Sequence, residues 1–369
     1  MTRCSALRRI PFTNDAHDWD PDQIHRTISC LRLPRQLSYQ NVLQAKRVNP
    51  VVRLLKLFPW LAVASAIVFS IDAPRMPADS AEMIPVRAAY IPVVTWLPAW
   101  IAKDKGFFER NGLNVSLTVT QNLSVLPGTL GRQFDFAPST APDLIKAVVG
   151  GIDVVAVAGQ AIETKDNPST HVIVRADSTL RSMQDLKGKV VATPTIGAII
   201  HVSLLHTLKK NGVDPASIRA VEIPFPNMAD QLKAGNVDAV EALEPFAGQL
   251  LAAGNRSLGD PLLTAGGDEV LYPFWISQGK WAESHRGVIE AWVASLEQAK
   301  AFIDANPSEA RAVLAKYTRL PTPVVEKIPF STYRFSLRSQ DFAIWVTILK
   351  DLGQIANSVD ESRLVVNFK

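Results

Sequence analysis

Few residues of this chain could carry chemistry, and their spacing does not assemble a catalytic centre. The six histidines show no metal-ligand spacing, and His201 and His206, five residues apart, would lie on different faces of a helix. The sequence lacks the G-x-S-x-G turn of hydrolases, the G-x-x-x-x-G-K-S/T phosphate loop and the G-x-G-x-x-G dinucleotide fingerprint. Both cysteines, Cys4 and Cys30, lie in the first 50 residues, so the rest of the chain has no thiol nucleophile. These features favour a binding protein, and we expect no metal and no cofactor.

The clearest candidate binding site lies between residues 186 and 246. Residues 190–193 form an apolar run that suits a buried strand, and residues 198–210 carry apolar side chains at helical spacing before Asn211-Gly212 stops the helix. The first amides of this helix, and the positive end of its dipole, point back to the loop at 193–197. We therefore expect a carboxylate, sulfonate or other anion to bind there.

Hydroxyl and amide side chains follow two further expected strands. Ser139 and Thr140 stand between a short strand at 134–137 and a helix at 143–149, where a hydroxyl can cap the helix, contact a ligand or do both. Gln160 follows another buried strand, and its amide has the donor and the acceptor that orient a polar substrate. Because these positions lie at the carboxyl ends of strands, we expect them to open into one crevice.

Two larger side chains each allow two interpretations. Trp96 begins a helix expected at 96–110, just after a strand at 86–91, so its ring either packs in the core or contacts a ligand. Glu244 stands at a strand end before Pro245, where it either forms a structural salt bridge or accepts a hydrogen bond from a ligand. An ionised Glu244 in the crevice would repel a pure anion, which points to a zwitterion or a cationic group.

Composition indicates a globular protein with no affinity for nucleic acid. Of the 369 residues, 47% are apolar and 20% are charged, which is ordinary for a globular chain long enough for two domains. The formal charge of +4 is misleading, because the basic excess lies in the first 80 residues and the remainder carries 28 basic against 29 acidic side chains. A near-neutral body gives no support to a nucleic-acid partner.

The first 80 residues indicate export. Residues 1–52 show no helical or strand period, and we interpret them as a disordered or misassigned N-terminal extension. Residues 53–80 have the form of a signal peptide, with Arg53 and Lys56, an apolar run at 57–71 and a small-residue exit near Ser80. The alternative is an apolar segment retained as an anchor. Because no cysteine follows the run, we expect a periplasmic protein that is not a lipoprotein.

Several segments of the chain resemble one family. They are WIAKDKGFFERNGLNVSLTV at 100–119, RADSTLRSMQDLKGKVVATP at 175–194, KKNGVDPASIRAVEI at 209–223, LKAGNVDAVEALEPF at 232–246 and ANPSEARAVLAKYTRLP at 305–321. In this order they look like the motifs of periplasmic solute-binding proteins of the nitrate/sulfonate/taurine class of ABC importers. The resemblance spans about residues 84 to 365.

The resemblance implies an α/β fold, a two-lobed periplasmic-binding-protein clamshell (type II) with two crossover strands, one of them at 274–276. Lobe one would comprise residues 84–174 plus 275–369, and lobe two residues 175–274. A monomer would hold a small organic anion or zwitterion between the lobes and deliver it to ABC permease subunits. Carried over by position, the ligand-binding residues would be Trp96, Ser139, Thr140, Gln160, Thr195, Ile196, Gly197 and Glu244.

One departure from the family pattern bears on the ligand. Where relatives commonly have Gly-Ser-Ser or Gly-Ser-Thr before the lobe-two helix, residues 195–200 read Thr-Ile-Gly-Ala-Ile-Ile. Aliphatic carbons there disfavour nitrate or taurine and favour an anion with an apolar or aromatic body flanked by Ile196 and Trp96. The alternative is an enzyme of the same fold acting on a thiamine precursor or a sulfinate. Against this alternative, the chain after residue 80 lacks the cysteines on which those enzymes depend.

Overall fold

The computed structural model describes residues 82–366. These residues lie in one compact unit, which contact clustering places at residues 74–369. The expected N-terminal extension, signal peptide and cleavage site lie outside the described residues. None of the helices between residues 82 and 366 has the length and apolar character needed to cross a membrane.

The described residues form a mixed α/β fold with four sheets. Strand order in the largest sheet is β10-β6-β9-β7-β8, and the smaller sheets are β1-β2, β3-β12-β4 and β11-β5-β13. The strands are β1 (Ile84–Tyr90), β2 (Leu113–Val119), β3 (Ala137–Ser139), β4 (Val155–Gly159), β5 (Ala161–Thr164), β6 (Thr170–Val174), β7 (Val190–Thr193), β8 (Arg219–Glu222), β9 (Ala239–Leu243), β10 (Arg256–Gly259), β11 (Glu269–Leu271), β12 (Phe274–Ser277) and β13 (Thr332–Tyr333).

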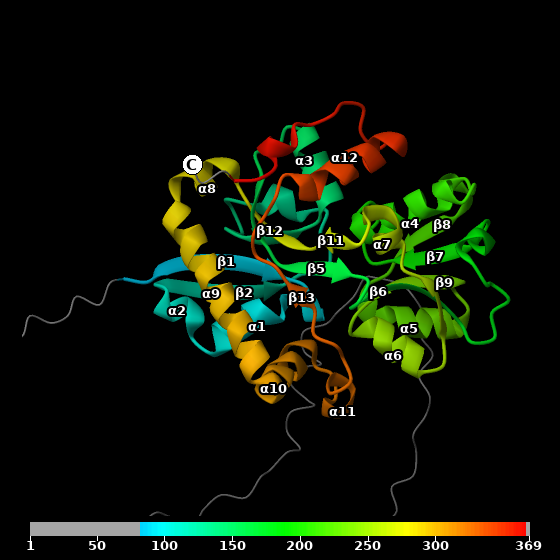
Figure 1. Ribbon diagram of the computed structural model, residues 1–369, viewed down its shortest axis with the longest axis horizontal. Coiled ribbons are helices and arrows are strands. Elements are labelled where there is room, and N and C mark those ends of the chain that lie inside the picture. Colours follow the sequence, from blue (N-terminus) through cyan, green and yellow to red (C-terminus); the bar gives the residue numbers. More distant parts are fainter. Residues whose placement is uncertain (1–81, 367–369) are drawn as a thin grey trace, which may run out of the picture. The chain divides into compact units, whose positions relative to one another are not determined.

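Helices cover these sheets, and they separate into two sets along the chain. The first lobe contains α1 (Leu97–Asp104), α2 (Phe107–Arg110), α3 (Ala141–Val149), α8 (Gly279–Ser284), α9 (Arg286–Ala305), α10 (Pro307–Thr318), α11 (Thr322–Val325) and α12 (Gln340–Asp351). The second lobe, built on the five-stranded sheet, contains α4 (Ile199–Lys210), α5 (Phe225–Ala234), α6 (Phe246–Ala252) and α7 (Pro261–Gly266). Figure 1 shows α4 to α7 around the sheet that holds β6 to β9.

Two strands carry the chain between the lobes. β5 follows β4 of the first lobe and leads to β6 of the second, and β11 returns from α7 to β12 (Figure 1). The two pair in antiparallel register, with Glu269 opposite Thr164. The expected two-lobed clamshell with two crossover strands is confirmed, but the return crossover is β11. Residues 274–276 belong instead to β12, between β3 and β4.

The strand and helix expected around the candidate site are confirmed. β7 lies between β8 and β9 and pairs in parallel with both, so it is an inner strand of the sheet, and its Val191, Ala192 and Thr193 are buried. α4 buries Leu204 and Leu208 in one apolar cluster with Val191 and Ala239 of this sheet. The helix ends at Asn211, after which Gly212 takes a φ of +72°. The predicted lobe boundaries stay a prediction; β6, at 170–174, lies in the second-lobe sheet.

Three expected helices differ from the structure. The helix predicted at 96–110 breaks into α1 and α2 because Gly106 adopts a φ of +70°. Apolar residues at helical spacing predict one helix at 281–304, but the structure divides this segment at His285 into α8 and α9. The sequence also suggests a short helix at 123–133, and this prediction is wrong. The segment forms only a 3₁₀ turn at Leu126–Thr129, with Pro127 inside it and Gly131 at a φ of +75° beyond it.

A chain of aromatic rings fixes the entry to α1. The rings of Trp96 and Trp275 meet edge to face with centroids 4.6 Å apart, and Trp275 meets Trp292 of α9 at 4.8 Å. All three side chains are fully buried. Edge-to-face pairs of this kind add stability beyond the area they bury. Trp96 is therefore part of the core and also held firmly where the first lobe faces the second.

Candidate ligand-binding site

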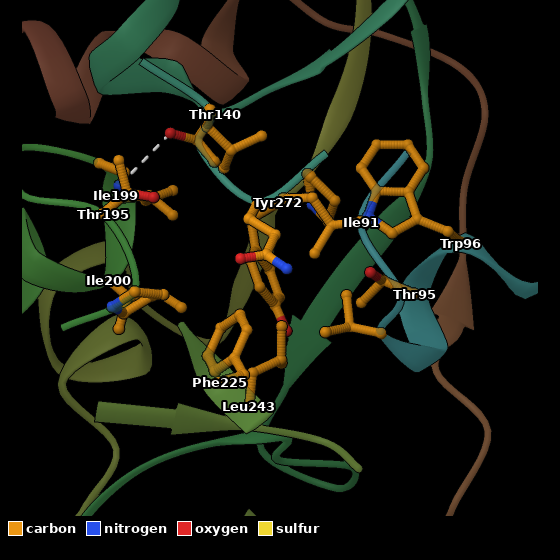
Figure 2. A pocket seen from close by; sticks show the side chains of 16 residues that line it. Ile91, Thr95, Trp96, Thr140, Thr195, Ile199, Ile200, Phe225, Leu243 and Tyr272 are labelled. Atoms are coloured by element: carbon orange, nitrogen blue, oxygen red, sulfur yellow. Dashed lines mark hydrogen bonds between the residues drawn. The ribbon is translucent and has the colours of Figure 1, made fainter. Parts of the chain in front are cut away.

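A cavity of about 50 Å³ lies between the two lobes. Its lining residues from the first lobe are Ile91, Val93, Thr95, Trp96, Gln121, Leu123 and Thr140. The second lobe adds Pro194, Thr195, Ala198, Ile199, Ile200, Phe225 and Leu243, and the segment after β11 adds Tyr272 and Pro273. Figure 2 shows Thr95 and Trp96 on one side of this cavity and Thr195, Ile199 and Ile200 on the other. None of the 16 lining side chains is charged.

Uncommitted polar groups face this apolar cavity. The hydroxyl of Thr95 is buried without a hydrogen-bond partner in the structure. Within residues 82–366, the indole N–H of Trp96 and the hydroxyl of Thr195 also make no hydrogen bond, although both side chains line the cavity. All three groups can donate. The cavity is therefore suited to a ligand whose polar end is an acceptor.

The start of α4 supplies further donors. The amide of Ile199 donates to Thr140 Oγ1 across the lobe boundary at 3.3 Å, the dashed line in Figure 2. Thr140 Oγ1 in turn donates to Asp143 Oδ2 at 2.5 Å. In the described part of the chain, the next amides, those of Ile200 and His201, have no backbone or side-chain acceptor. A helix N-terminus with free amides favours negative charge.

Gly197 is held by groups from both lobes. Its carbonyl oxygen accepts from Lys146 Nζ at 2.5 Å, and its amide donates to His201 Nδ1 at 3.0 Å. Burial lowers the pKa of Lys146, and burial together with the Lys146 charge lowers the pKa of His201 to about 4. His201 is thus neutral at pH 7 and can accept. The peptide groups of Gly197 are engaged in positioning the loop.

The structure brings three of the eight expected site residues to the cavity. Trp96 and Thr140 approach from the first lobe and Thr195 from the second, and each is nearly inaccessible to solvent. Their placement follows from the elements around them, because each stands where a strand ends and a helix is about to begin. Ligand contact by these three side chains stays a prediction.

The other expected residues do not line the cavity in the structure. Ser139 donates its hydroxyl to the Thr140 carbonyl, and Gln160 bridges the Thr95 carbonyl and the Trp275 indole at 2.6 and 2.7 Å. Ile196 is 48% exposed and points away, so Ile199 and Ile200 provide the aliphatic wall instead. Ligand roles for Ser139, Gln160, Ile196 and Gly197 stay predictions.

Glu244 lies in a different groove, beside Pro245 and Gly248. Its side chain is 6% exposed, its Oε2 accepts from the Gly248 amide at 3.2 Å, and burial raises its pKa. Among the described residues no cation forms an ion pair with it. The salt bridge expected for Glu244 is not formed among these residues, and its role as a ligand acceptor stays a prediction.

Several cavity residues were not expected from the sequence. They share a place at the end of a strand or the first turn of a helix: Thr95, Ile199, Ile200, Phe225 and Leu243. Thr95 and Leu243 are direct neighbours of residues that were expected. The alternation of side chains along an extended segment decides which neighbour faces the cavity, and the sequence does not show that orientation. No group of three or more His, Cys, Asp or Glu side chains within residues 82–366 could hold a metal ion.

A match to a known family model establishes the family of this chain. Residues 95–310 match the model of the family described as NMT1/THI5 like. The chain belongs to this NMT1/THI5-like family. The matched segment begins at Thr95 and includes most of the cavity, from Trp96 through Pro273.

Curated relatives of this NMT1/THI5-like chain include binding proteins and a biosynthesis protein. This chain is 29% identical over 229 residues to a putative thiamine biosynthesis protein of Haemophilus influenzae. The match covers 61% of this chain and 70% of that protein. It is 28% identical over 198 residues to a putative aliphatic sulfonates-binding protein of Escherichia coli (strain K12). That match covers 53% of this chain, and the chain spans only 57% of that relative's length.

Solved structures share the fold of this NMT1/THI5-like chain. The alkanesulfonate-binding protein from Xanthomonas axonopodis pv. citri, bound to MOPS, superposes with a TM-score of 0.66 at 21% identity, covering 78% of this chain and 99% of that one. A desulfurization enzyme superposes with a TM-score of 0.56 at 16% identity over 77% of this chain and 97% of that one. The fold therefore accommodates both binding and catalysis.

Proposed function

We propose that this chain is the substrate-binding component of an ABC importer and captures a small organic anion between its lobes. The observation that carries the proposal is the cavity itself, which is closed between two lobes, free of charged side chains and supplied with unpaired donors. Family relatives named as sulfonate-binding and periplasmic binding proteins support the same function.

The donors favour an anion over a zwitterion. Thr95, Trp96, Thr195 and the first amides of α4 can all donate to sulfonate or carboxylate oxygens. No carboxylate lines the cavity, so an ammonium group would have no counter-charge there. Because most of the walls are apolar, the anion would carry an apolar or aromatic body, as the sequence around Ile199 predicts.

Capture would proceed by a shift between open and closed arrangements of the lobes. In the structure, three hydrogen bonds already cross between the lobes. The Ile199 amide donates to Thr140 Oγ1, Lys146 Nζ donates to the Gly197 carbonyl, and Asn122 Nδ2 donates to Glu222 Oε1 at 3.0 Å. A ligand in the cavity would touch both lobes only when they are closed, and its extra contacts would stabilise that state.

The cavity favours binding without chemical conversion. Its lining contains no histidine, carboxylate, lysine or cysteine that could act as a general base or nucleophile. The hydroxyl of Tyr272 is engaged with Ser169 Oγ at 2.7 Å, and burial raises its pKa well above the ordinary value. Catalysis on a thiamine precursor or a sulfinate is the second candidate function. One relative is named a putative thiamine biosynthesis protein, and one solved structure of this fold is a desulfurization enzyme.

Partners and location follow from this function as further proposals. An exported monomer with a cleaved signal peptide and no lipid anchor would meet its ligand in the periplasm and dock on an ABC permease when closed. Relatives named as periplasmic binding proteins support the compartment.

A thermal-shift screen tests the proposed function. The purified protein is heated with sulfonates, aromatic and aliphatic carboxylates, nitrate, taurine and thiamine precursors, and each compound is recovered and identified by mass spectrometry. We expect a large upward shift with an anion that has an apolar body, recovered intact. Tight binding of nitrate or taurine alone would contradict the ligand class, and recovery of a converted product would establish the enzyme.

A further inference from the structure

A buried carboxylate holds the first crossing of the chain between the lobes. Glu163, on β5, is fully buried, and its Oε1 accepts from the amides of Ser169 and Thr170 at 2.5 and 2.9 Å. Its Oε2 accepts from the Ser169 hydroxyl at 2.6 Å. Glu163 therefore ties the outgoing crossover strand to the first residues of β6 in the second lobe.

The same contacts reach the return crossing and the wall of the ligand cavity. Tyr272 follows β11 and lines that cavity, and its hydroxyl lies 2.7 Å from Ser169 Oγ. The single hydroxyl proton of Ser169 is donated to Glu163, so Ser169 accepts from Tyr272. Donation thus runs from Tyr272 through Ser169 to Glu163. Because both oxygens of Glu163 act as acceptors here, this carboxyl group is ionised.

A second carboxyl group reaches Glu163 from the second lobe. Asp260 precedes α7, which packs against β5, and its Oδ1 accepts from the first amides of that helix at 2.8 and 3.1 Å. Asp260 Oδ2 is buried, and no donor among residues 82–366 reaches it. If both carboxyl groups were ionised, two negative charges would lie together away from water. One proton on Asp260 removes this repulsion and supplies a hydrogen bond to Glu163.

The surroundings of Asp260 favour that proton at neutral pH. Burial, the charge of Glu163 and the hydrogen bond to Glu163 raise the pKa of Asp260 from an ordinary 3.8 to about 8. We call the five residues Glu163, Ser169, Thr170, Asp260 and Tyr272 the hinge cluster, because it joins both crossings to the second lobe.

The other titratable groups near the hinge cluster, as far as the described residues show, supply no free cation. His171 on β6 is neutral at pH 7, because burial lowers its pKa. Glu244 is an acid and can carry no positive charge. Lys165 and Asp268, at the ends of the two crossings, pair with each other at the surface. The proton on Asp260 is therefore the group that offsets the second carboxylate.

We propose that the hinge cluster is a proton-dependent hinge: one proton between Asp260 and Glu163 holds the two crossings and the Tyr272 wall of the cavity in place, and loss of this proton to solvent releases them. In the released state the two carboxylates would separate and be hydrated, and the Ser169 and Thr170 amides would lose their acceptor. This inference goes beyond ligand binding and does not depend on which ligand the cavity takes.

The direction of the pH dependence follows from linkage. A released Asp260 regains its ordinary pKa of 3.8, whereas the intact hinge cluster holds the proton up to about pH 8. The proton therefore favours the intact cluster, and its contribution is lost progressively as pH rises from 3.8 to about 8. Each opening in that range releases one proton, so the opening equilibrium should rise about tenfold for each pH unit.

Amide hydrogen exchange of the unliganded protein tests this inference. The Ser169 and Thr170 amides, which donate to Glu163, report opening of the hinge cluster. Asp260→Asn is the matched variant, because asparagine keeps the cap of α7 and an N–H donor toward Glu163 but cannot ionise. Dividing wild-type rates by variant rates at each pH removes the intrinsic pH dependence of exchange. This ratio should rise about tenfold per pH unit below pH 8, and a constant ratio would overturn the inference.

A titration of the wild-type protein decides the same question without a variant. Carbon-13 NMR of the side-chain carboxyl groups should show a pKa of about 8 for Asp260, with Glu163 ionised through the same range. An Asp260 carboxyl group that titrates near its ordinary 3.8 would show that no proton is held between the two residues, and would overturn the inference.

Discussion

The side-chain amine of Lys146, on α3 of the first lobe, donates a 2.5 Å hydrogen bond to the carbonyl oxygen of Gly197, in the loop that precedes α4 of the second lobe. The same loop is held from its own side, because the Gly197 amide donates to His201 Nδ1. Lys146 therefore joins the closed lobes beside the cavity without entering it. Gly197 leaves room for this contact, since a Cβ at that position would come within 2.9 Å of Lys146 Nζ.

Removing this donor should favour the open state. Lys146→Met deletes a charged hydrogen bond worth about 1.5 to 3 kcal/mol and should lower the affinity for the best-binding anion by at least about tenfold. Small-angle scattering of the unliganded protein should show a larger radius of gyration. Lys146→Arg keeps a donor and serves as the control. An unchanged radius in Lys146→Met would show that the bond does not hold the lobes together.

The hydroxyl of Thr195 should contribute directly to anion binding. Thr195→Val preserves the shape of the side chain and removes a donor that has no other partner in residues 82–366, so affinity should fall about tenfold or more while thermal stability is retained. Thr195→Ser keeps the hydroxyl and should bind nearly normally. Calorimetry separates the two, and the reverse ranking would assign the contact to the methyl group instead.

Gln160 should affect stability more than specificity. Its amide satisfies both the Thr95 carbonyl and the Trp275 indole, so Gln160→Leu leaves two buried polar groups unpaired at a cost of about 2 to 5 kcal/mol in the free energy of unfolding. The order of affinities within a ligand panel should not change. Gln249→Leu, on partly exposed α6, is the control and should cost little. A changed order of affinities would support the ligand contact predicted from the sequence.

Glu241 should make the second lobe sensitive to pH. This β9 side chain is fully buried, neither carboxyl oxygen has a partner even though the Thr193 hydroxyl lies nearby, and burial raises its pKa from an ordinary 4.5 to about 8. The folded state thus keeps a proton that the unfolded state loses, so stability due to Glu241 falls as pH rises from about 4.5 to 8.

Burial also raises the pKa of Asp260 to about 8, so Asp260 adds its own pH dependence. Because Asp260 is present in both proteins, comparing the wild-type protein with Glu241→Gln isolates the contribution of Glu241. Urea unfolding at a series of pH values measures the free energy of unfolding of both proteins. Between pH 5 and pH 8, this free energy should rise by a few kcal/mol in Glu241→Gln relative to the wild-type protein. A constant difference across this range would mean that Glu241 is ionised, or hydrated, in the folded protein.

Much of the fold could be predicted because its strands and helices carry strong periodicity. β7 has the predicted bounds, and α4 begins one residue after its predicted start. A short apolar run is typical of a buried strand, and apolar residues at helical spacing that end at Asn211-Gly212 are typical of a helix. The failures are at residues whose backbone conformation overrides the pattern. Gly106 and Gly131 adopt positive φ and interrupt segments whose side chains favour a helix.

The candidate site was only partly predictable. Thr195 could be found because it lies in the short loop between a buried strand and the next helix. Its neighbour Ile196 is 48% exposed, and the aliphatic wall comes from Ile199 and Ile200 at the start of that helix. Which side of an extended segment faces the cavity depends on the twist of the chain between elements. That orientation is set by tertiary packing and has no signal in residue spacing.

The most direct measurement is a crystal structure of the protein soaked with the tightest-binding sulfonate from the panel. We expect the intact compound between the lobes, with its oxygens within hydrogen-bond distance of the Thr195 hydroxyl and the Ile200 amide. A compound bound outside this cavity, or a reaction product in its place, would contradict the proposal that the chain captures an organic anion at the start of α4.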